Sequence, residues 1–295
     1  MLAAAFAGPA RPDPTRTDPG GTRPEPVPMA AQEREREQEL EPLPRPVELG
    51  VPRPGPGQVL IQVRAVCVLP GTPVPPGPYP AVPGGGVAGV VAQLGAGSYG
   101  WEVGDRVLGW CGAGAWAQYA AVPGDRLATR PDGLPWTAAC VLGGAALVAE
   151  SALQERGVGP GGRLLVLGAA SGPGALGVQL AHARGAAVLA VAAPRHHARL
   201  RALGAVPVSP ARAGATASGA VLDCSRLAGP PVPVSAERLD ELVEFWAEGR
   251  LRVDVAAVLP LEHAGEARRL ARSGRVWGSV LLAPASGRPR TGGGL

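Results

Sequence analysis

The chain has 295 residues, which is enough for two domains around a sizeable core. Its formal net charge of +4 comes from 28 basic residues, all of them arginine and scattered along the sequence. Because these residues do not cluster and only 4% of residues are aromatic, we expect no nucleic-acid binding. No apolar run reaches membrane-spanning length, so we expect no membrane segment. The four cysteines stand far apart without a C-x-x-C pair, as suits free thiols in a cytoplasmic protein.

The two ends of the chain lack the apolar residues that a core needs. Residues 1–46 are rich in Pro, Gly and Arg, and then in alternating Glu and Arg. They cannot bury enough apolar area to offset the entropy that is lost on ordering. We therefore predict a disordered tail over residues 1–46 and a second one over residues 285–295.

Residues 47–146 contain short strands separated by Gly- and Pro-rich turns. Alternating apolar residues predict a strand over 59–65, and further strands are expected over 87–93, after a Val-Gly-Asp-Arg-Val turn, and over 115–122. Such a series is typical of a small β-barrel-like domain. Residues 136–153 then predict a helix that leads out of this domain.

The stretch 162–193 predicts a strand, a glycine-rich turn, a helix over 174–183 and a second strand, which together form one βαβ unit. The turn contains a G-x-G-x-x-G match at Gly172, Gly174 and Gly177, directly after the first strand. Turns of this kind let a diphosphate approach the first amides of the helix, where the helix dipole is positive. The alternative is a tight strand-to-helix turn that binds nothing.

Several short motifs occur here in a fixed order. They are Pro-Gly-Pro-Gly at 54–57, Val-Pro-Gly at 82–84, Val-Gly-Asp-Arg-Val at 103–107, Ala-Gln-Tyr at 117–119, Val-Gly-Pro-Gly at 158–161 and the glycine turn at 168–179. In this order and spacing the sequence resembles the medium-chain dehydrogenase/reductase superfamily, and within it the quinone oxidoreductase (zeta-crystallin-like) branch. It is most similar to the animal quinone oxidoreductase-like proteins. The resemblance covers about 46–224 and resumes near 239–283.

The resemblance implies an α/β protein with a GroES-like β-barrel domain and a Rossmann-type domain built on a parallel sheet. We assign residues 47–146, completed by 250–284, to the GroES-like catalytic domain. Residues 147–249 are assigned to a shortened Rossmann domain that binds NADP(H).

The expected cofactor-binding residues are Ala170, Ser171, Gly172, Pro173, Gly174, Arg195 and His196. NAD enzymes place an acidic residue after the second strand, but here Arg195 and His196 follow that strand and no acid is present. A guanidinium suits the 2′-phosphate of NADP(H), which favours NADP(H) over NAD; the alternative is that both residues are merely solvated at a helix start. Ser171 and Pro173 stand where the branch has Gly and Val, and Pro173 lacks an amide donor, so we expect weakened phosphate binding.

We predict no zinc and assign no catalytic residue. The positions of the Cys and His that hold catalytic zinc in zinc-dependent relatives carry Leu69 and Gly85 here. Leu69 and Tyr79 are the candidates for the substrate pocket, although a loop tyrosine is as well explained by packing. Glu150 stands where the branch has an aromatic residue. No paired carboxylates, Ser-His-Asp set or activated cysteine is visible.

A segment of the family pattern is missing after Cys224. Residues 220–224 resemble the fourth Rossmann strand, but the sequence then leads directly to a helix over 237–248 and to the returning barrel segment. The missing part normally walls the nicotinamide and carries the edge strand used in dimerisation. Its loss leaves an open sheet edge, so the homodimer that the family forms is doubtful here.

Two functions remain open at this point. The first is an NADP(H)-dependent oxidoreductase that transfers a hydride to quinones or conjugated carbonyls without a metal. The alternative is a catalytically degenerate member of the family, which acts as a nucleotide-binding or scaffold module. Direct hydride transfer needs no acid or base from the protein, so the missing catalytic residues do not decide between the two.

Overall fold

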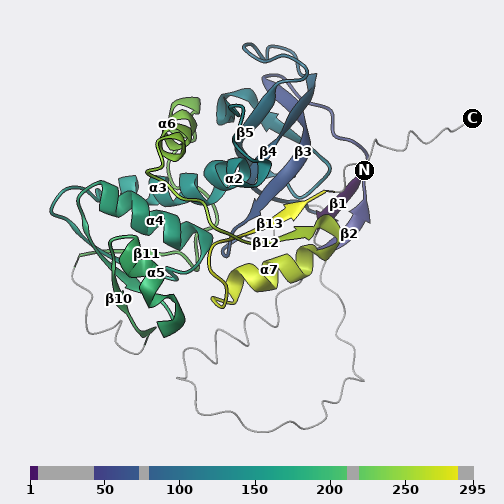
Figure 1. The fold of residues 1–295 in the computed structure, drawn as a ribbon. Coiled ribbons are helices and arrows are strands. Elements are labelled where there is room, and N and C mark those ends of the chain that lie inside the picture. Colours follow the sequence, from purple (N-terminus) through teal and green to yellow (C-terminus); the bar gives the residue numbers. More distant parts are fainter. Residues whose placement is uncertain (6–42, 73–79, 211–218, 285–295) are drawn as a thin grey trace, which may run out of the picture.

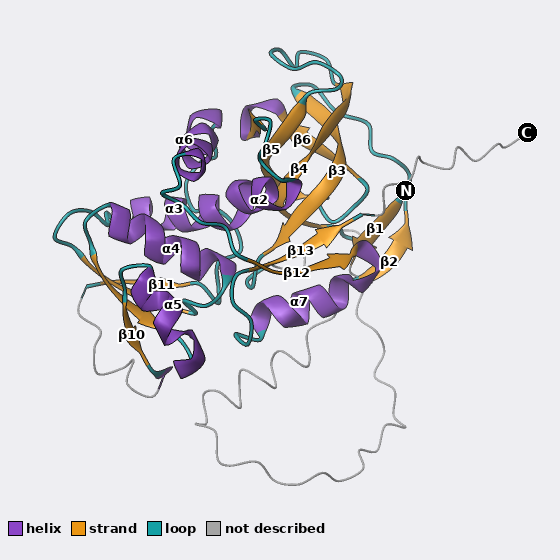
Figure 2. Cartoon of the chain, in the orientation of Figure 1, coloured by secondary structure: helices purple, strands orange, loops and turns teal. Residues whose placement is uncertain are grey.

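A computed structural model describes residues 1–5, 43–72, 80–210 and 219–284. These residues form two lobes, one built on a seven-stranded sheet and one on a four-stranded sheet (Figure 1). Figure 2 shows the long helical segment that passes between the two groups of strands. The predicted two-domain α/β architecture is confirmed.

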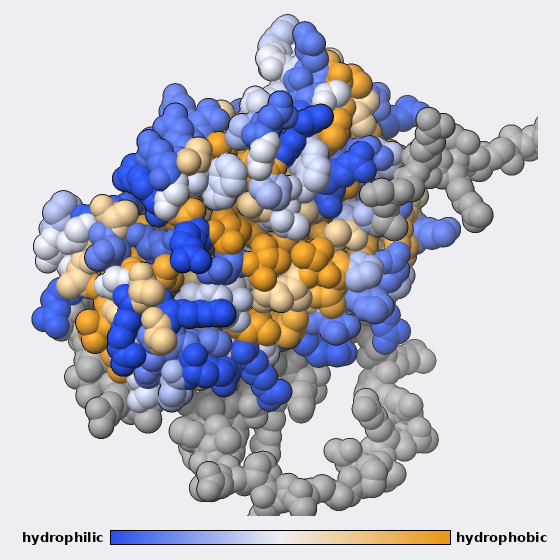
Figure 3. Space-filling model, in the orientation of Figure 1, coloured by the Kyte–Doolittle hydropathy of each residue, from blue (hydrophilic) through white to orange (hydrophobic). Residues whose placement is uncertain are grey.

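The larger sheet forms the barrel-like lobe. Its strands are β3 (Gln58–Val68), β4 (Pro83–Leu94), β5 (Arg106–Ala113), β6 (Tyr119–Pro123), β7 (Leu127–Thr129), β12 (Val255–Pro260) and β13 (Ser279–Ala283). They are ordered β12-β13-β3-β4-β5-β7, and β6 pairs with β3. The returning segment therefore adds its two strands to this lobe, as the sequence predicts. The edge strand β12 exposes Val255 and Val258, and Figure 3 shows apolar residues gathered across the middle of this face.

The first residues of the chain belong to the fold. β1 (Leu2–Ala5) pairs antiparallel with β2 (Arg45–Glu48), and Ala3, Ala4 and Ala5 are fully buried. The Ala4 amide also donates to Trp116 O at 2.8 Å. The prediction of disorder over residues 1–46 is thus wrong for residues 1–5 and 43–46, because pairing with distant strands outweighs a local composition that disfavours order. Residues 6–42 and 285–295 lie outside the described part of the chain.

A continuous helical rod joins the lobes. It consists of α2 (Trp136–Val141), a π-helical turn at Leu142–Ala146 and α3 (Leu147–Glu155). The helix predicted over 136–153 is confirmed, but its π turn was not predicted. By length and composition this rod could cross a membrane, yet 83% of its apolar window is buried inside the protein, as in the core helix of a globular fold.

The smaller sheet contains β8 (Arg163–Leu167), β9 (Ala187–Val191), β10 (Val206–Val208) and β11 (Ala220–Asp223), all parallel and in the order β10-β9-β8-β11. The helices that accompany it are α4 (Gly172–Ala183) and α5 (His197–Ala202), while α6 (Ala236–Ala247) and α7 (Ala264–Arg272) follow later. Within the described residues the sheet ends at β11, as the missing segment predicts. Arg156 Nε donates to Val221 O at 2.9 Å and so satisfies one carbonyl of this edge.

An ion pair joins α3 to the end of α4. Glu150 and Arg184 bond directly through a carboxylate oxygen and a guanidinium nitrogen, and both side chains are largely buried. Burial raises the pKa of Glu150, while Arg184 lowers it and Glu241 on α6 raises it again. Glu150 therefore fills the position of the expected aromatic residue as a partnered charge.

Arg184→Ala is expected to lower the free energy of unfolding by about 1–3 kcal/mol at pH 8, because it leaves the Glu150 carboxylate buried without its cation. The loss of Arg184 moves the folded-state pKa of Glu150 still further above its unfolded value. A carboxyl group whose pKa is raised in the folded state destabilises the fold while it is charged. The loss of unfolding free energy in the variant should therefore shrink as the pH falls to 5 and Glu150 takes up a proton. Urea unfolding at the two pH values measures this difference.

Arg106→Ala is the matched control, because the Arg106–Asp132 pair is exposed and such pairs contribute little. We expect it to change stability by less than about 1 kcal/mol at either pH. A deficit for Arg184→Ala that is the same at pH 5 and pH 8 would contradict the role assigned to Glu150.

Candidate dinucleotide-binding site

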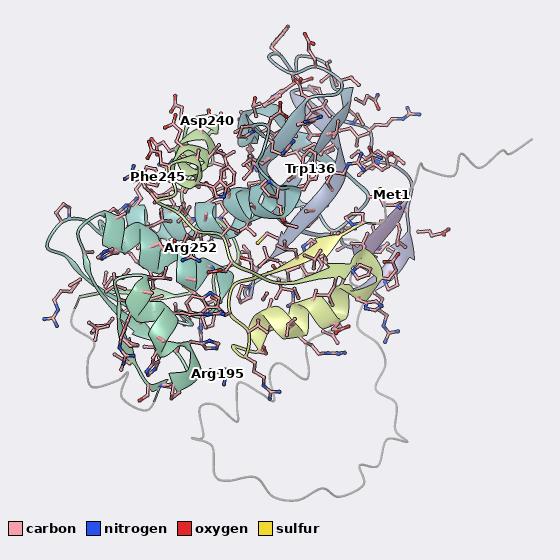
Figure 4. The ribbon with its side chains drawn as sticks, in the orientation of Figure 1. Met1, Trp136, Arg195, Asp240, Phe245 and Arg252 are labelled. Atoms are coloured by element: carbon pink, nitrogen blue, oxygen red, sulfur yellow. The ribbon has the colours of Figure 1, made fainter. Side chains whose placement is uncertain are left out.

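The residues predicted to bind the cofactor lie at one edge of the smaller sheet. Residues 170–174 follow β8, and Arg195 and His196 follow β9. Because β8 and β9 are adjacent and parallel, their carboxyl ends meet at the same edge, which is where open α/β sheets bind ligands. Figure 4 places Arg195 at the edge of the smaller lobe, near the end of α7.

The first turn of α4 is capped by its own sequence. The Ser171 hydroxyl accepts a hydrogen bond from the Gly174 amide at 3.2 Å and donates one to Gly168 O at 2.8 Å. Pro173 in the first turn has no amide hydrogen to offer. Ser171 therefore acts as the N-cap of α4 and takes up an amide that a phosphate would otherwise use.

Each of the three glycines of the G-x-G-x-x-G match lies close to another part of the protein. A Cβ on Gly174 would lie 2.3 Å from Gly168 O, so this glycine makes the tight turn. A Cβ on Gly177 would lie 2.9 Å from Leu222 Cδ2, so Gly177 allows α4 to pack against β11. A Cβ on Gly172 would lie 2.1 Å from Ser279 Oγ. The space beside Gly172 is thus filled by the chain.

The segment that leads from α7 into β13, and includes the first residue of that strand, lies beside this turn. We call residues 275–279 the strap. The Gly278 amide donates to Ala170 O at 2.9 Å, and Ser171 and Gly278 form an isolated parallel bridge. Gly172 and its two successors in the first turn of α4 are buried. Figure 1 shows this yellow turn beside α4 and α5.

The basic end of the candidate site is built around Trp277. Its ring is 9% exposed and lies 5.7 Å from the His196 ring, and the Arg199 guanidinium is 5.5 Å from its centroid. Burial lowers the pKa of His196, and the neighbouring Arg195 and Arg199 lower it further. His196 is therefore a buried neutral ring, which accepts a hydrogen bond from Arg195 Nε at 3.2 Å. The exposed cations here are Arg195 and Arg199, which leaves His196 poorly suited to bind a phosphate.

These residues suit the 2′-phosphate end of NADP(H) better than its diphosphate. Arg195 and Arg199 offer exposed guanidinium groups after β9, where no carboxylate stands, and this suits a 2′-phosphate. The first turn of α4 offers few free amides to a diphosphate, because Ser171 takes the Gly174 amide and Pro173 has none. Ser279 fills the side of Gly172 on which a Cβ would lie.

The predicted substrate residues are not brought to an opening. Leu69 is fully buried just after β3, and its carbonyl accepts from the Thr72 hydroxyl at 2.9 Å. It packs in the core, and its assignment to the substrate pocket stays a prediction. Tyr79 lies outside the described residues.

The described part of the chain holds no group of three or more His, Cys, Asp or Glu side chains placed for a metal. All four cysteines are free and buried. Burial raises the pKa of Cys67 and of Cys111 to about 12, and it raises those of Cys140 and Cys224 as well. None of these thiols is activated for nucleophilic chemistry.

Sequence analysis did not identify Trp277, Ser279 or Asp254 as part of this region. Their segment carries the apolar pattern of a returning barrel strand, and nothing in that pattern indicates contact with α4. The Trp277 indole donates to Asp254 Oδ2 at 2.9 Å, and the Ser279 amide donates to Asp254 O at 2.8 Å. These contacts are tertiary and leave no local signal.

A barrel-like lobe is joined here to an open parallel sheet through a shared helix, and this fold is shared with solved alcohol dehydrogenase structures. Residues 55–132 match the family model of the alcohol dehydrogenase GroES-like domain, and residues 140–282 match that of the zinc-binding dehydrogenase domain. The chain belongs to the family that these two models describe, the medium-chain dehydrogenase/reductase superfamily.

Two curated relatives and one solved structure illustrate this placement. The trans-enoyl reductase tazE of Aspergillus terreus is 34% identical over 50% of this chain and 57% of its own length. The chloroplastic NADPH-dependent alkenal/one oxidoreductase of Arabidopsis thaliana is 35% identical over 43% of this chain and 36% of its own length. The chain thus matches only about half or less of these relatives. The quinone oxidoreductase structure from Coxiella burnetii aligns with a TM-score of 0.69 at 24% identity, over 81% of this chain and 94% of that one, which shows a shared fold.

Proposed function

We propose that the protein is an NADP(H)-dependent oxidoreductase that transfers a hydride to quinones or conjugated carbonyls without a metal. The relatives support the reaction class, because they include an enoyl reductase and an NADPH-dependent alkenal/one oxidoreductase. The physiological substrate would be a small molecule with a carbonyl conjugated to a double bond or ring.

The observation that carries the choice of NADP(H) is the exposed Arg195 at the end of β9. Ribose hydroxyls of NAD are normally held by a carboxylate at this point, and here the chain runs from Ala192 through Pro194 to Arg195 without one. A planar guanidinium can make paired hydrogen bonds to a phosphate, so it favours the cofactor with the 2′-phosphate.

A second function is favoured by the covered first turn of α4. A family member whose first turn of α4 offers few free amides, whose Leu69 lies in the core and whose described sheet ends at β11 could serve as a nucleotide-binding or scaffold module without turnover. Buried unreactive thiols suit a reducing compartment for either function, so we propose a cytoplasmic protein.

A titration of the purified protein with NADPH and, in parallel, with NADH tests the nucleotide site through the fluorescence of the reduced cofactor. For the enzyme we expect preferential NADPH binding, followed by loss of NADPH absorbance when a small quinone or enone is added. Binding without turnover would support the nucleotide-binding module. No binding of either nucleotide at millimolar concentration would contradict both nucleotide-dependent functions.

A further inference from the structure

We propose that two copies of the chain associate through the face of the smaller sheet that α4 and α5 do not cover, with the two sheets stacked across a twofold axis. The contact is between sheet faces and not between sheet edges. It uses no residue of the candidate dinucleotide-binding site, so it is independent of the proposed function.

The smaller sheet buries only one of its faces in the core of the protein. The side chains of that face belong to the larger buried cluster and are Leu164, Val166, Val188, Ala190 and Leu222. Both α4 and α5 lie on that side (Figure 2), because each makes a right-handed crossover between neighbouring parallel strands in the same direction. The alternate residues of these strands point to the second face and belong to neither buried cluster. Parallel sheets are normally covered on both faces, so the second face lacks its cover in the described part of the chain.

A row of apolar side chains crosses this second face. The strand register aligns one residue from each strand, namely Val206, Leu189, Leu165 and Val221. Residues aligned in this way point to the same side of a parallel sheet. Val206 is 61% exposed and Val221 is 39% exposed, at the two ends of the row. A hollow of about 420 Å³ adjoins the row at Leu189 and Val206, so the side chains of the described residues leave this surface unfilled.

The two charged strand residues of the second face stand on opposite sides of the row. Arg163 precedes the row by two positions in β8, and Asp223 follows it by two positions in β11. Arg163 is exposed. The side chain of Asp223 is 32% exposed, although it accepts hydrogen bonds from Ser225 and lies 3.6 Å from the Arg226 guanidinium. The face therefore carries a positive charge before its apolar row and a negative charge after it.

This charge pattern selects a second copy of the chain as the occupant. A twofold axis along the row turns one sheet over onto the other with its strands reversed, so that each residue of the row meets its own counterpart. The same rotation brings Arg163 of one copy towards Asp223 of its partner, and it does so twice in the dimer. Sheets stacked about 10 Å apart interdigitate their apolar side chains and exclude water between them.

The size of the face predicts a weak dimer. The sheet has four strands of at most five residues, and with strands about 4.8 Å apart these cover about 300 Å². A standard interface buries about 800 Å² on each partner. We therefore expect a dissociation constant of about 10–100 μM and a monomer–dimer equilibrium that depends on concentration.

Sedimentation velocity of the full chain over about a hundredfold range of concentration tests the contact. Val206→Glu places two carboxylates against each other on the twofold axis and should weaken dimerisation by about tenfold or more. Val103→Glu is the matched control, because it makes the same change at a valine that is 64% exposed in a turn of the barrel-like lobe. We expect the control to dimerise as the wild type does.

A charge swap tests the twofold arrangement itself. Arg163→Asp and Asp223→Arg each bring like charges together across the contact, so each should weaken dimerisation by about threefold or more. The double variant Arg163→Asp/Asp223→Arg restores opposite charges at both places. It should recover the dissociation constant of the wild type, which a general loss of folding by either single variant would not allow.

The outcomes decide the proposal without reference to the cofactor. A wild-type protein that stays monomeric over the whole range would overturn it. A dimer that Val206→Glu and Val103→Glu affect equally would use another surface and would also overturn it. Weak association by both single charge variants without recovery in the double variant would contradict the twofold arrangement. None of these results changes the expected binding of NADPH, so the proposed function is tested separately.

Discussion

Gly86→Ala is expected to destabilise the protein by about 3 kcal/mol or more, which is the largest effect we predict for one added methyl group. A Cβ on Gly86 would lie 2.3 Å from the backbone nitrogen and Cα of Gly144 and 2.4 Å from Cys140 O. Gly86 belongs to β4, whereas Gly144 and Cys140 belong to the helical rod. Backbone atoms on either side cannot rotate away from an added methyl group. The midpoint of urea unfolding measures the loss.

Gly159→Ala is the matched control, because an added Cβ there meets nothing within 4 Å and the residue lies in a loop. We expect it to be neutral or slightly stabilising, since alanine restricts the unfolded chain. Equal effects of the two substitutions would mean that β4 and the rod are not in close backbone contact.

Arg195→Glu is expected to weaken NADPH binding by about tenfold or more, because it replaces the guanidinium that we propose for the 2′-phosphate with a negative charge like that of the phosphate. NADH has no such phosphate, so its affinity should change much less. The ratio of the two dissociation constants is the measurement, and it is independent of any change in the amount of folded protein.

Arg163→Glu provides the matched charge reversal. Arg163 is exposed at the start of β8, at the opposite end of the strands from Arg195, and the net charge changes by the same amount. We expect it to leave the NADPH-to-NADH ratio unchanged. A ratio that shifts equally in both variants would show a general effect of charge and not a phosphate contact.

The parts of the fold that could be predicted from the sequence are those fixed by neighbouring residues. The apolar run and glycine turn of 163–183 form β8 and α4 with boundaries within two residues of the prediction. The start of α4 is set locally, since Ser171 caps it and Pro173 is compatible with its first turn. The end of the described sheet at β11 was also expected from the sequence, because the part of the family pattern that normally follows Cys224 is missing.

The parts that could not be predicted depend on residues far apart in the chain. β1 is stabilised by pairing with β2 and by a bond to Trp116, so its own four residues carry little signal. The coverage of α4 requires that β13 and the strap lie against Gly172, which is about a hundred positions earlier. A glycine pattern indicates that another group comes close to the backbone, but it does not identify that group. Here the approaching group at Gly172 is Ser279, whereas the motif suggested a phosphate.

A buried cluster that the two lobes share links the stabilities of the two halves of this protein. One cluster of buried residues includes Cys67 and Leu108 of the barrel-like lobe, Leu147 of the rod, and Val166 and Leu222 of the smaller sheet. Neither half could be cut away without exposing this shared apolar interior to water. The chain should therefore unfold in one cooperative transition, and a damaging substitution in either half would be felt throughout the molecule.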